Sequence, residues 1–189
     1  MKQAFNILLL GASYGSLLAT KLALAGHNAK LICLPDEVSL INKEGTLVRM
    51  PVKGREGLYD ISSKKLSGKI EAIGPDQVQA DEFDLAVLAM QEPQYRSADI
   101  KNVLKDLAAA KIPCMSIMNM PPLTYLKRIN GLDTTKYRDS YADASVWDQL
   151  DPNLMTLCSP DPQAFRPPDE PINVLQVRLP TNFKAARFE

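Results

Sequence analysis

The sequence has few of the residues that build metal, redox and disulfide sites. Its 189 residues include one histidine, His27, and three cysteines, Cys33, Cys114 and Cys158, which are widely separated and lack a C-x-x-C spacing. A single histidine excludes a two-histidine metal site and leaves any Ser–His or Cys–His pair dependent on one residue. The cysteines are expected to be small apolar core residues in a reducing compartment. The sequence therefore predicts no metal site, a structural role for His27 and a cytoplasmic location.

Net charge and long apolar runs are lacking as well. The 22 basic and 22 acidic residues cancel, so no overall positive field would attract nucleic acid or anionic lipid. The apolar run at residues 7–10 is far too short to cross a bilayer. The composition is that of a soluble globular protein, with 46% hydrophobic and 23% charged residues. We therefore expect one domain with a sizeable core and neither a nucleic acid nor a membrane as partner.

Short apolar runs alternate with helical patterns along the first 131 residues. Continuous apolar runs, typical of strands buried on both faces of a parallel sheet, occur at residues 5–10, 29–34, 85–90 and 114–118. A first helix is predicted after residue 11, with an apolar stripe of Leu17, Leu18, Leu22 and Ala25, and Gly26 would end it. A later amphipathic helix is predicted from Ile100, Val103, Leu104 and Leu107.

The alternation of strand and helix predicts an α/β fold, a Rossmann-like doubly wound and mainly parallel sheet. Residues 36–44 are expected to form a short helix. Residues 46–50 and 69–73 are expected to form short β pieces, whose pairing the sequence does not determine.

The composition changes after Gly131, because no glycine follows and half of the 14 prolines lie beyond it. We expect a helix over residues 135–150, with Trp147, Tyr137, Tyr141 and Val146 on its apolar face, either in the core or against another domain or subunit. Strands are expected at 154–158 and 172–179, with a proline-rich loop between them. The chain is accordingly divided into a Rossmann domain, 1–131, and a short β-rich extension, 132–189. That extension would pack on the Rossmann domain, lead to a helical domain outside these residues, and offer a surface for a homodimer.

The turn after the first strand is the candidate cofactor site, and it reads Gly11-Ala12-Ser13-Tyr14-Gly15-Ser16. A dinucleotide site needs residues without bulk here, because the backbone must approach a pyrophosphate held by N–H groups at the helix N-terminus. Ser13 stands at the second glycine of G-x-G-x-x-G, and Gly15 comes one residue before the third. The alternative is a tight strand-to-helix turn that binds no dinucleotide.

The tip of the second strand bears on the choice between NAD and NADP. NAD enzymes often carry an acid near this point, and NADP enzymes an arginine. Here Leu34 stands at the tip, Asp36 and Glu37 follow, and no arginine is near in the sequence. Because two acids would repel a 2′-phosphate, NAD is marginally favoured over NADP. Alternatively, the two acids only occupy the first turn of the next helix, where carboxylates suit the helix dipole.

Three segments together resemble the N-terminal domain of ketopantoate reductases. They are Asn-Ile-Leu-Leu-Leu-Gly-Ala-Ser at 6–13, Leu-Ala-Leu-Ala-Gly-His at 22–27 and Asp-Leu-Ala-Val-Leu-Ala-Met at 84–90. The wider 6-phosphogluconate-dehydrogenase-like group, with the opine and glycerol-3-phosphate dehydrogenases, is similar, and the resemblance covers roughly residues 6–119. It implies a Rossmann domain, followed in the family by a mostly helical domain that supplies the catalytic lysine and much of the substrate site.

The resemblance implies reduction of a keto group with NADPH, and it also shows departures. Ser13 replaces the family's second glycine, Leu34 replaces a basic residue, and Gln91 stands at the expected lysine. By the resemblance, the nicotinamide would lie near Met90, Gln91 and Asn119, and Asn119 is the candidate catalytic residue. Alternatively, Asn119 caps a helix beginning at Pro121.

Two functions follow from the sequence. The first is an NAD(P)-binding domain of an oxidoreductase that reduces a keto acid or oxidises the matching hydroxy acid. The second is a non-catalytic Rossmann module for nucleotide sensing or protein assembly, which the altered glycine turn and the missing lysine favour.

Overall fold

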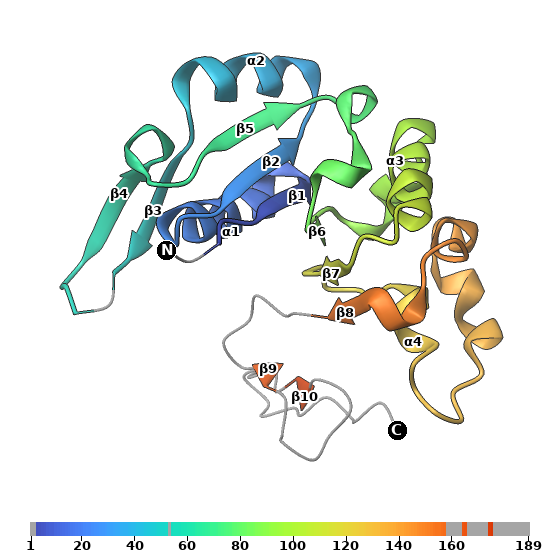
Figure 1. The fold of residues 1–189 in the computed structure, drawn as a ribbon. Coiled ribbons are helices and arrows are strands. Elements are labelled where there is room, and N and C mark those ends of the chain that lie inside the picture. The colour runs from blue at the N-terminus through green and yellow to red at the C-terminus, as the bar shows by residue number, and fades with distance from the viewer. Residues whose placement is uncertain (1–2, 53, 158–163, 166–173, 176–189) are drawn as a thin grey trace.

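The computed structural model describes residues 3–52, 54–157, 164–165 and 174–175, and its centre is a six-stranded sheet (Figure 1). The strands lie in the order β5-β2-β1-β6-β7-β8, and every pairing among them is parallel. Their bounds are β1 Asn6–Leu10, β2 Asn28–Ile32, β5 Ile70–Ile73, β6 Leu85–Leu88, β7 Cys114–Ser116 and β8 Met155–Leu157. The chain builds outward from β1 to β5, then returns to β6 and builds outward on the other side. This is the doubly wound Rossmann order, as the sequence predicted.

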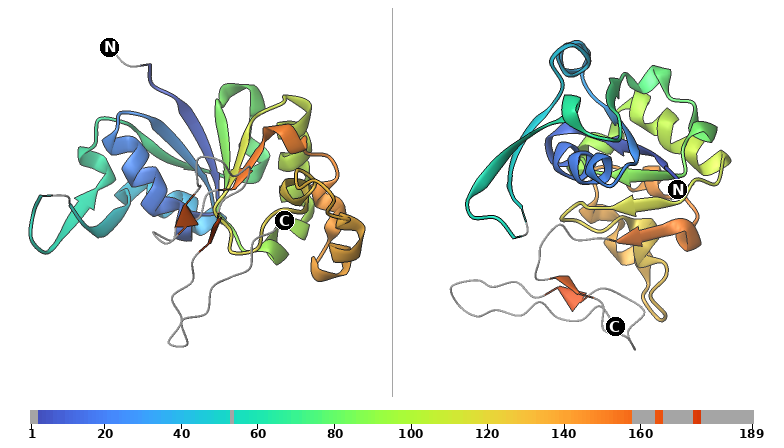
Figure 2. Two further views of the ribbon diagram at one scale, coloured as in Figure 1. Left: turned by 90° about the horizontal axis from the view of Figure 1, so that it is seen from below. Right: turned by 60° about the vertical axis from the view of Figure 1, so that its left-hand side comes forward.

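Helices cover both faces of the sheet (Figure 2). Ile7 and Leu9 of β1 pack with α1 (Ala12–Leu24) and α2 (Pro35–Glu44), whereas Leu8 and Leu10 pack with α3 (Ala98–Ala109). This division follows from the strand geometry, because successive side chains point to opposite faces. All four apolar residues that predicted α3 are buried, which confirms that helix.

The apolar stripe expected on α1 is correct only in part, because Leu18 and Leu22 pack against the core but Leu17 and Ala25 are exposed. The residues that α1 buries are Gly15, Ala19, Thr20 and Ala23, whereas Leu17 is 41% exposed. A Cβ at Gly15 would lie 3.2 Å from Leu31 Cδ2, so the helix packs close to the sheet through its small residues. The predicted end of the helix is correct, since Gly26 follows it with a φ of 91°.

An antiparallel hairpin separates α2 from β5 and extends away from the sheet (Figure 1). It consists of β3 (Leu47–Pro51) and β4 (Leu58–Ser62), and Arg49 is paired with Asp60 across it at 2.6 Å. The β pieces expected at 46–50 and 69–73 are thus confirmed as β3 and β5. The strand β4 was not predicted.

The helix expected over 135–150 is wrong. Tyr137, expected on its apolar face, is 41% exposed. This region instead contains the short 3₁₀ turns η5 (Thr134–Ser140) and η6 (Ala144–Trp147), with α4 (Leu123–Leu126) before them and η7 (Pro152–Leu154) after them. An aspartate opens each 3₁₀ turn, because Asp133, Asp143 and Asp151 each accept a hydrogen bond from the backbone N–H two residues later. These local bonds compete with a continuous helix.

The sheet and its core continue beyond Gly131. The predicted strand at 154–158 is present as β8 and pairs with β7. Trp147, Tyr141 and Val146 are buried in the core beneath α3, together with Met155. The division of the whole chain at Gly131 stays a prediction, but the described residues share the sheet and this core as far as Leu157.

Four further 3₁₀ turns complete the described elements: η1 (Ser63–Lys65), η2 (Pro75–Gln77), η3 (Ala80–Glu82) and η4 (Glu92–Arg96). Most of the strand expected at 172–179, most of the proline-rich loop, and Cys158 lie outside the described residues. Within them, β9 (Ala164–Phe165) pairs with β10 (Val174–Leu175). His27 has a structural contact, since its Nδ1 accepts a hydrogen bond from the Phe5 N–H at 3.2 Å.

Cys33 and Cys114 are buried free thiols, as expected. Burial raises the pKa of Cys33 to about 11, with a smaller contribution from Glu37, and raises that of Cys114 to about 12. In the described part of the chain, no three His, Cys, Asp or Glu residues are grouped so as to hold a metal ion. None of the helices described there combines the length and apolar character that crossing a bilayer requires.

Candidate functional site

The candidate site lies at the carboxyl ends of β1 and β6. These strands are neighbours, but the chain leaves β1 for α1 on one face of the sheet and leaves β6 for α3 on the other. In doubly wound proteins, ligands bind in the crevice that lies at such a reversal of strand order. Because the strands are parallel, Gly11, Leu34, Met90 and Asn119 all follow strands that end at this edge of the sheet.

The turn at Gly11 requires glycine. Gly11 has a φ of 107°, which L side chains rarely adopt. A Cβ there would lie 2.7 Å from Met90 Cγ and 3.1 Å from the Ala89 carbonyl oxygen. The absence of a side chain therefore lets the β1–α1 turn and the end of β6 come into contact.

The first turn of α1 presents backbone donors toward the crevice. The helix begins at Ala12 with no side-chain cap, so its first N–H groups have no partner within the helix. Ser13 is exposed and Tyr14 is 54% exposed. For neither side chain does the described part of the chain offer a hydrogen-bond partner, and neither fills the turn. The backbone at residues 12–14 is therefore accessible to an anion.

Gly15 and Ser16 have other roles in this turn. Gly15 is buried against Leu9 and Leu31, which is the close helix-to-strand contact expected of a third glycine. The Ser16 hydroxyl donates to the Ala12 carbonyl at 2.5 Å within the helix. Of the six predicted turn residues, Ala12, Ser13 and Tyr14 are thus the ones at the uncapped start of the helix.

The two acids that follow β2 differ in their hydrogen-bond partners. Asp36 and Glu37 lie in the first turn of α2, and Glu37 accepts a hydrogen bond from the Leu34 N–H at 3.1 Å. Leu34 is 71% exposed, so it offers an apolar surface beside the crevice. Asp36 is exposed, and the described residues contain no polar partner for it. Asp36 is therefore the acid that remains free for a ligand.

The loop after β6 is held from within the protein. Met90 donates its N–H to the Tyr95 hydroxyl at 3.2 Å, and Gln91 donates its N–H to Gln94 Oε1 at 2.8 Å. Glu92 is only 6% exposed and accepts a hydrogen bond from the Ala142 N–H at 3.1 Å. Sequence reasoning missed Glu92 and Tyr95, because no sequence pattern links residue 92 to residue 142.

The predicted capping role of Asn119 is wrong. The helix after β7 is α4, its N-cap is Pro122, and it has no side-chain cap. Asn119 is exposed in the loop between β7 and α4, and its side chain has no hydrogen-bond partner among the described residues. The structure thus leaves the Asn119 amide free at the carboxyl edge of the sheet.

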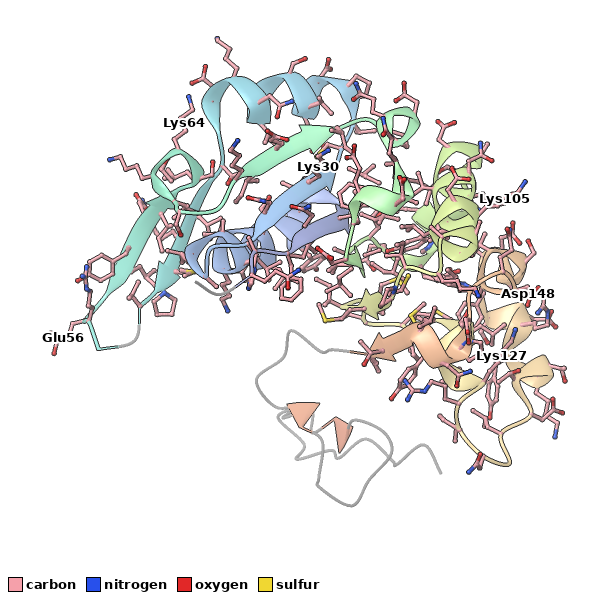
Figure 3. All side chains as sticks on the ribbon, in the orientation of Figure 1. Lys30, Glu56, Lys64, Lys105, Lys127 and Asp148 are labelled. Carbon is pink, nitrogen blue, oxygen red and sulfur yellow. The ribbon has the colours of Figure 1, made fainter. Side chains whose placement is uncertain are left out.

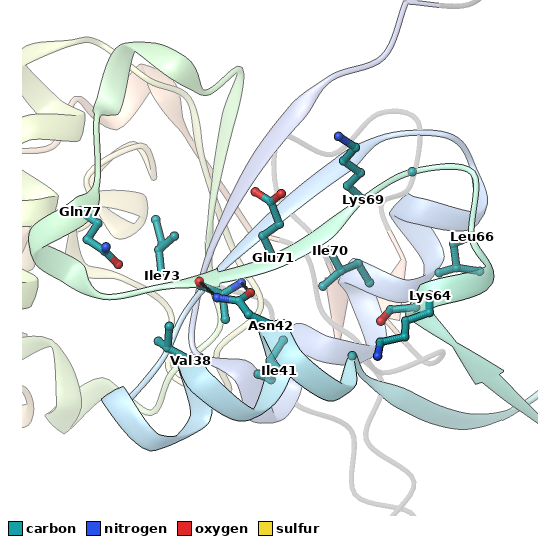
Figure 4. A pocket seen from close by; sticks show the side chains of 14 residues that line it. Val38, Ile41, Asn42, Lys64, Leu66, Lys69, Ile70, Glu71, Ile73 and Gln77 are labelled. Carbon is teal, nitrogen blue, oxygen red and sulfur yellow. Dashed lines mark hydrogen bonds between the residues drawn. The ribbon is translucent and has the colours of Figure 1, made fainter.

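A separate hollow of about 660 Å³ lies between α2 and the edge strand β5 (Figure 4). Its wall includes Asn42, which donates from Nδ2 to the Ala72 carbonyl and accepts from the Ala72 N–H, both at 2.8 Å. None of the residues that the sequence singled out for the site lines this hollow. It is therefore distinct from the crevice between β1 and β6.

Charged side chains are distributed over the surface (Figure 3). The labelled Lys30, Lys64 and Lys105 come from β2, η1 and α3, and the labelled Lys127 and Asp148 form an ion pair at 3.3 Å. This arrangement agrees with the balanced charge of the sequence.

Comparison with solved structures identifies the fold. A crystal structure from Ralstonia solanacearum MolK2, assigned provisionally as a ketopantoate reductase, matches with a TM-score of 0.55 and 15% identity, over 86% of this chain and 46% of that one. The chain has the fold of a ketopantoate reductase. The resemblance read from residues 6–119 is thus confirmed at the level of the fold.

A second match is weaker. A 2-dehydropantoate 2-reductase from Bacillus subtilis, also a provisional assignment, matches with a TM-score of 0.42 and 15% identity, over 67% of this chain and 37% of that one. The chain therefore spans less than half the length of these two structures. No family model matches the chain, and no curated protein matches it.

Proposed function

We propose that this chain binds NAD or NADP in the crevice between β1 and β6, as the cofactor-binding part of an oxidoreductase acting on a keto acid or its hydroxy acid. The observation that carries the proposal is the Gly11 turn at the reversal point of a ketopantoate-reductase-like sheet, with uncapped N–H groups at residues 12–14. Such donors at a helix N-terminus suit a diphosphate.

The proposed arrangement assigns each end of the cofactor to described residues. The diphosphate lies on Ala12, Ser13 and Tyr14, the adenosine lies by Leu34 and Asp36, and the nicotinamide lies by Met90, Gln91 and Asn119. Asp36 could accept a hydrogen bond from the ribose 2′-hydroxyl and would repel a 2′-phosphate, which favours NAD slightly.

The bound cofactor would supply the hydride, and the residues of the crevice would orient it. Gln91 and Asn119 carry amides, which donate and accept hydrogen bonds but do not transfer protons readily. The nearby carboxylate of Glu92 is buried and already bonded to Ala142. We therefore assign binding and orientation to these residues, and proton transfer to groups beyond them.

The direct test is a calorimetric titration of the protein with NADH, NADPH and ADP-ribose. We expect binding of at least one dinucleotide, and a loss of at least about tenfold in affinity for Ser13→Asp, because the new carboxylate would face the diphosphate. The substitution should leave the fold intact, since a carboxylate suits the first turn of a helix.

Ser140→Asp is the matched control, because Ser140 is exposed in η5 and the change adds the same charge. We expect its affinities to equal those of the wild-type protein. An absence of binding by the wild-type protein up to millimolar ligand would overturn the proposed function.

The second candidate is a non-catalytic module that senses a nucleotide, and Gln91 at the position of the family's lysine favours it. This function predicts dinucleotide binding without turnover. An assay of the full-length gene product against 2-keto and 3-keto acids separates the two, since turnover excludes a purely sensing role.

A further inference from the structure

Three buried aromatic side chains meet beneath the loops of the crevice. Tyr95 comes from η4, Trp147 comes from η6, and Tyr141 comes directly after η5. The Trp147 ring lies 5.2 Å from the Tyr95 ring and 6.5 Å from the Tyr141 ring, between centroids. Tyr95 and Trp147 are fully buried, and Tyr141 is nearly so. We call these three residues the aromatic cluster.

The two tyrosine hydroxyl groups of the aromatic cluster form hydrogen bonds with the backbone of two different loops. The Tyr95 hydroxyl accepts the N–H of Met90, in the loop after β6, at 3.2 Å. The Tyr141 hydroxyl donates to the carbonyl of Pro121, in the loop after β7, at 2.7 Å. Since the rings pack against Trp147, movement of either hydroxyl would disturb the same buried cluster.

Glu92 adds a second connection between these segments. Its carboxylate accepts a hydrogen bond from the N–H of Ala142, the residue after Tyr141. Burial raises the pKa of Tyr141 to about 12, and the charge of Glu92 contributes. Tyr141 therefore keeps its proton near neutral pH and remains a donor to Pro121.

We propose that Tyr95 and Tyr141 are positioning residues, which fix the loops carrying Met90, Gln91 and Asn119 for the nicotinamide half of the cofactor. The inference rests on the proposed function. It assigns a role to residues 141–147, which follow the predicted Rossmann domain in sequence and yet determine the geometry of its crevice. The adenosine and diphosphate contacts belong to other segments, namely the β1–α1 turn and the tip of β2.

Tyr141→Phe tests the proposal, because it removes one hydroxyl and keeps the ring against Trp147. Titrations should compare NADH, or NADPH if that is the ligand bound, with ADP-ribose, which lacks the nicotinamide. We expect the affinity for the dinucleotide to fall about fivefold, the effect of one lost hydrogen bond, and that for ADP-ribose to change less than about twofold. Equal changes for both ligands, or no change for either, would overturn the proposal.

Tyr137→Phe is the matched control, because Tyr137 is 41% exposed and its hydroxyl has no hydrogen-bond partner in the described part of the chain. Its affinities for both ligands should equal those of the wild-type protein. A selective loss of dinucleotide affinity in this control would also count against the role of Tyr141.

Hydrogen–deuterium exchange tests the positioning without any ligand. Tyr141→Phe should increase exchange at residues 117–122, and Tyr95→Phe should increase it at residues 89–92, while β1 and β2 stay protected. If the wild-type protein binds neither ligand, the proposed function fails and this measurement alone decides the positioning. Unchanged exchange in both loops would overturn it.

Discussion

At the scale of single residues, the contact between Met90 and Gly11 governs access to the crevice. Met90 Cγ lies 2.7 Å from the position that a Cβ of Gly11 would take, so the thioether side chain packs against the turn. The Met90 backbone is fixed by Tyr95, but its side chain has three rotatable bonds and can turn without moving the loop. The Met90 side chain therefore partly covers the turn beside Gly11.

Replacement of the Met90 side chain by a smaller one should strengthen binding of the dinucleotide. We expect Met90→Ala to bind the dinucleotide about three- to tenfold more tightly, because no side chain must be displaced before the ligand enters. Met50→Ala, on the β3–β4 hairpin, is the control for loss of a partly buried methionine and should leave affinity unchanged. Calorimetry gives the sign directly: weaker binding by Met90→Ala would show that Met90 is a ligand contact instead.

At the scale of elements, Asn42 protects the exposed edge of the sheet. Strand β5 lies at this edge, and unpaired backbone groups there would be free to pair with another chain. The Asn42 amide occupies both the N–H and the carbonyl of Ala72, as a neighbouring strand would. The side chain thereby connects α2 to β5 and occupies the Ala72 backbone groups that an added strand would otherwise bind.

Removal of the amide should cost stability and promote association. We expect Asn42→Ala to lower the free energy of unfolding by about 1–2 kcal/mol, because Ala72 loses two hydrogen bonds. Self-association should also rise with concentration, since the edge becomes available. Urea unfolding and sedimentation measure the two effects. The control is Asn102→Ala on the exposed side of α3, which should change neither the stability nor the association state. An Asn42→Ala variant that stays monomeric and fully stable would contradict this role for the amide.

The elements also show what sequence patterns predict well. The central strands were predictable because β1, β2, β6 and β7 are largely buried on both faces and read as mainly apolar runs. The strand β4 was missed, since most of its side chains are exposed and no such run marks it. The late helix was predicted wrongly because the aromatic spacing suggests one apolar face, whereas Asp133, Asp143 and Asp151 each open a separate short turn through a local capping bond.

Prediction of the candidate site was limited in a similar way. The Gly11 turn could be located because its residues are consecutive and follow a predicted strand. The contacts of Glu92 with Ala142 and of Tyr141 with Pro121 join residues 50 and 20 positions apart. Spacing within one element carries no information about such pairs, so only the folded structure reveals them.

At the scale of the whole molecule, the described residues beyond Gly131 belong to the folding unit. Tyr141, Val146 and Trp147 fill the core beneath α3, and β8 completes the sheet. We expect a chain ending at Leu157 to unfold cooperatively, and a chain ending at Gly131 to lack a cooperative transition, because it loses this part of the core. Circular dichroism during urea unfolding measures this. Cooperative unfolding of the shorter chain would instead support a domain boundary at Gly131.

The position of Trp147 also gives the molecule an internal optical probe. It is the only tryptophan, it is fully buried, and its ring stacks near the Tyr95 that holds Met90. Its emission overlaps the absorption of a reduced nicotinamide, so NADH seated beside Met90 would quench it by energy transfer. ADP-ribose has no such acceptor, so quenching by NADH and not by ADP-ribose would report binding of the reduced nicotinamide ring without any added label.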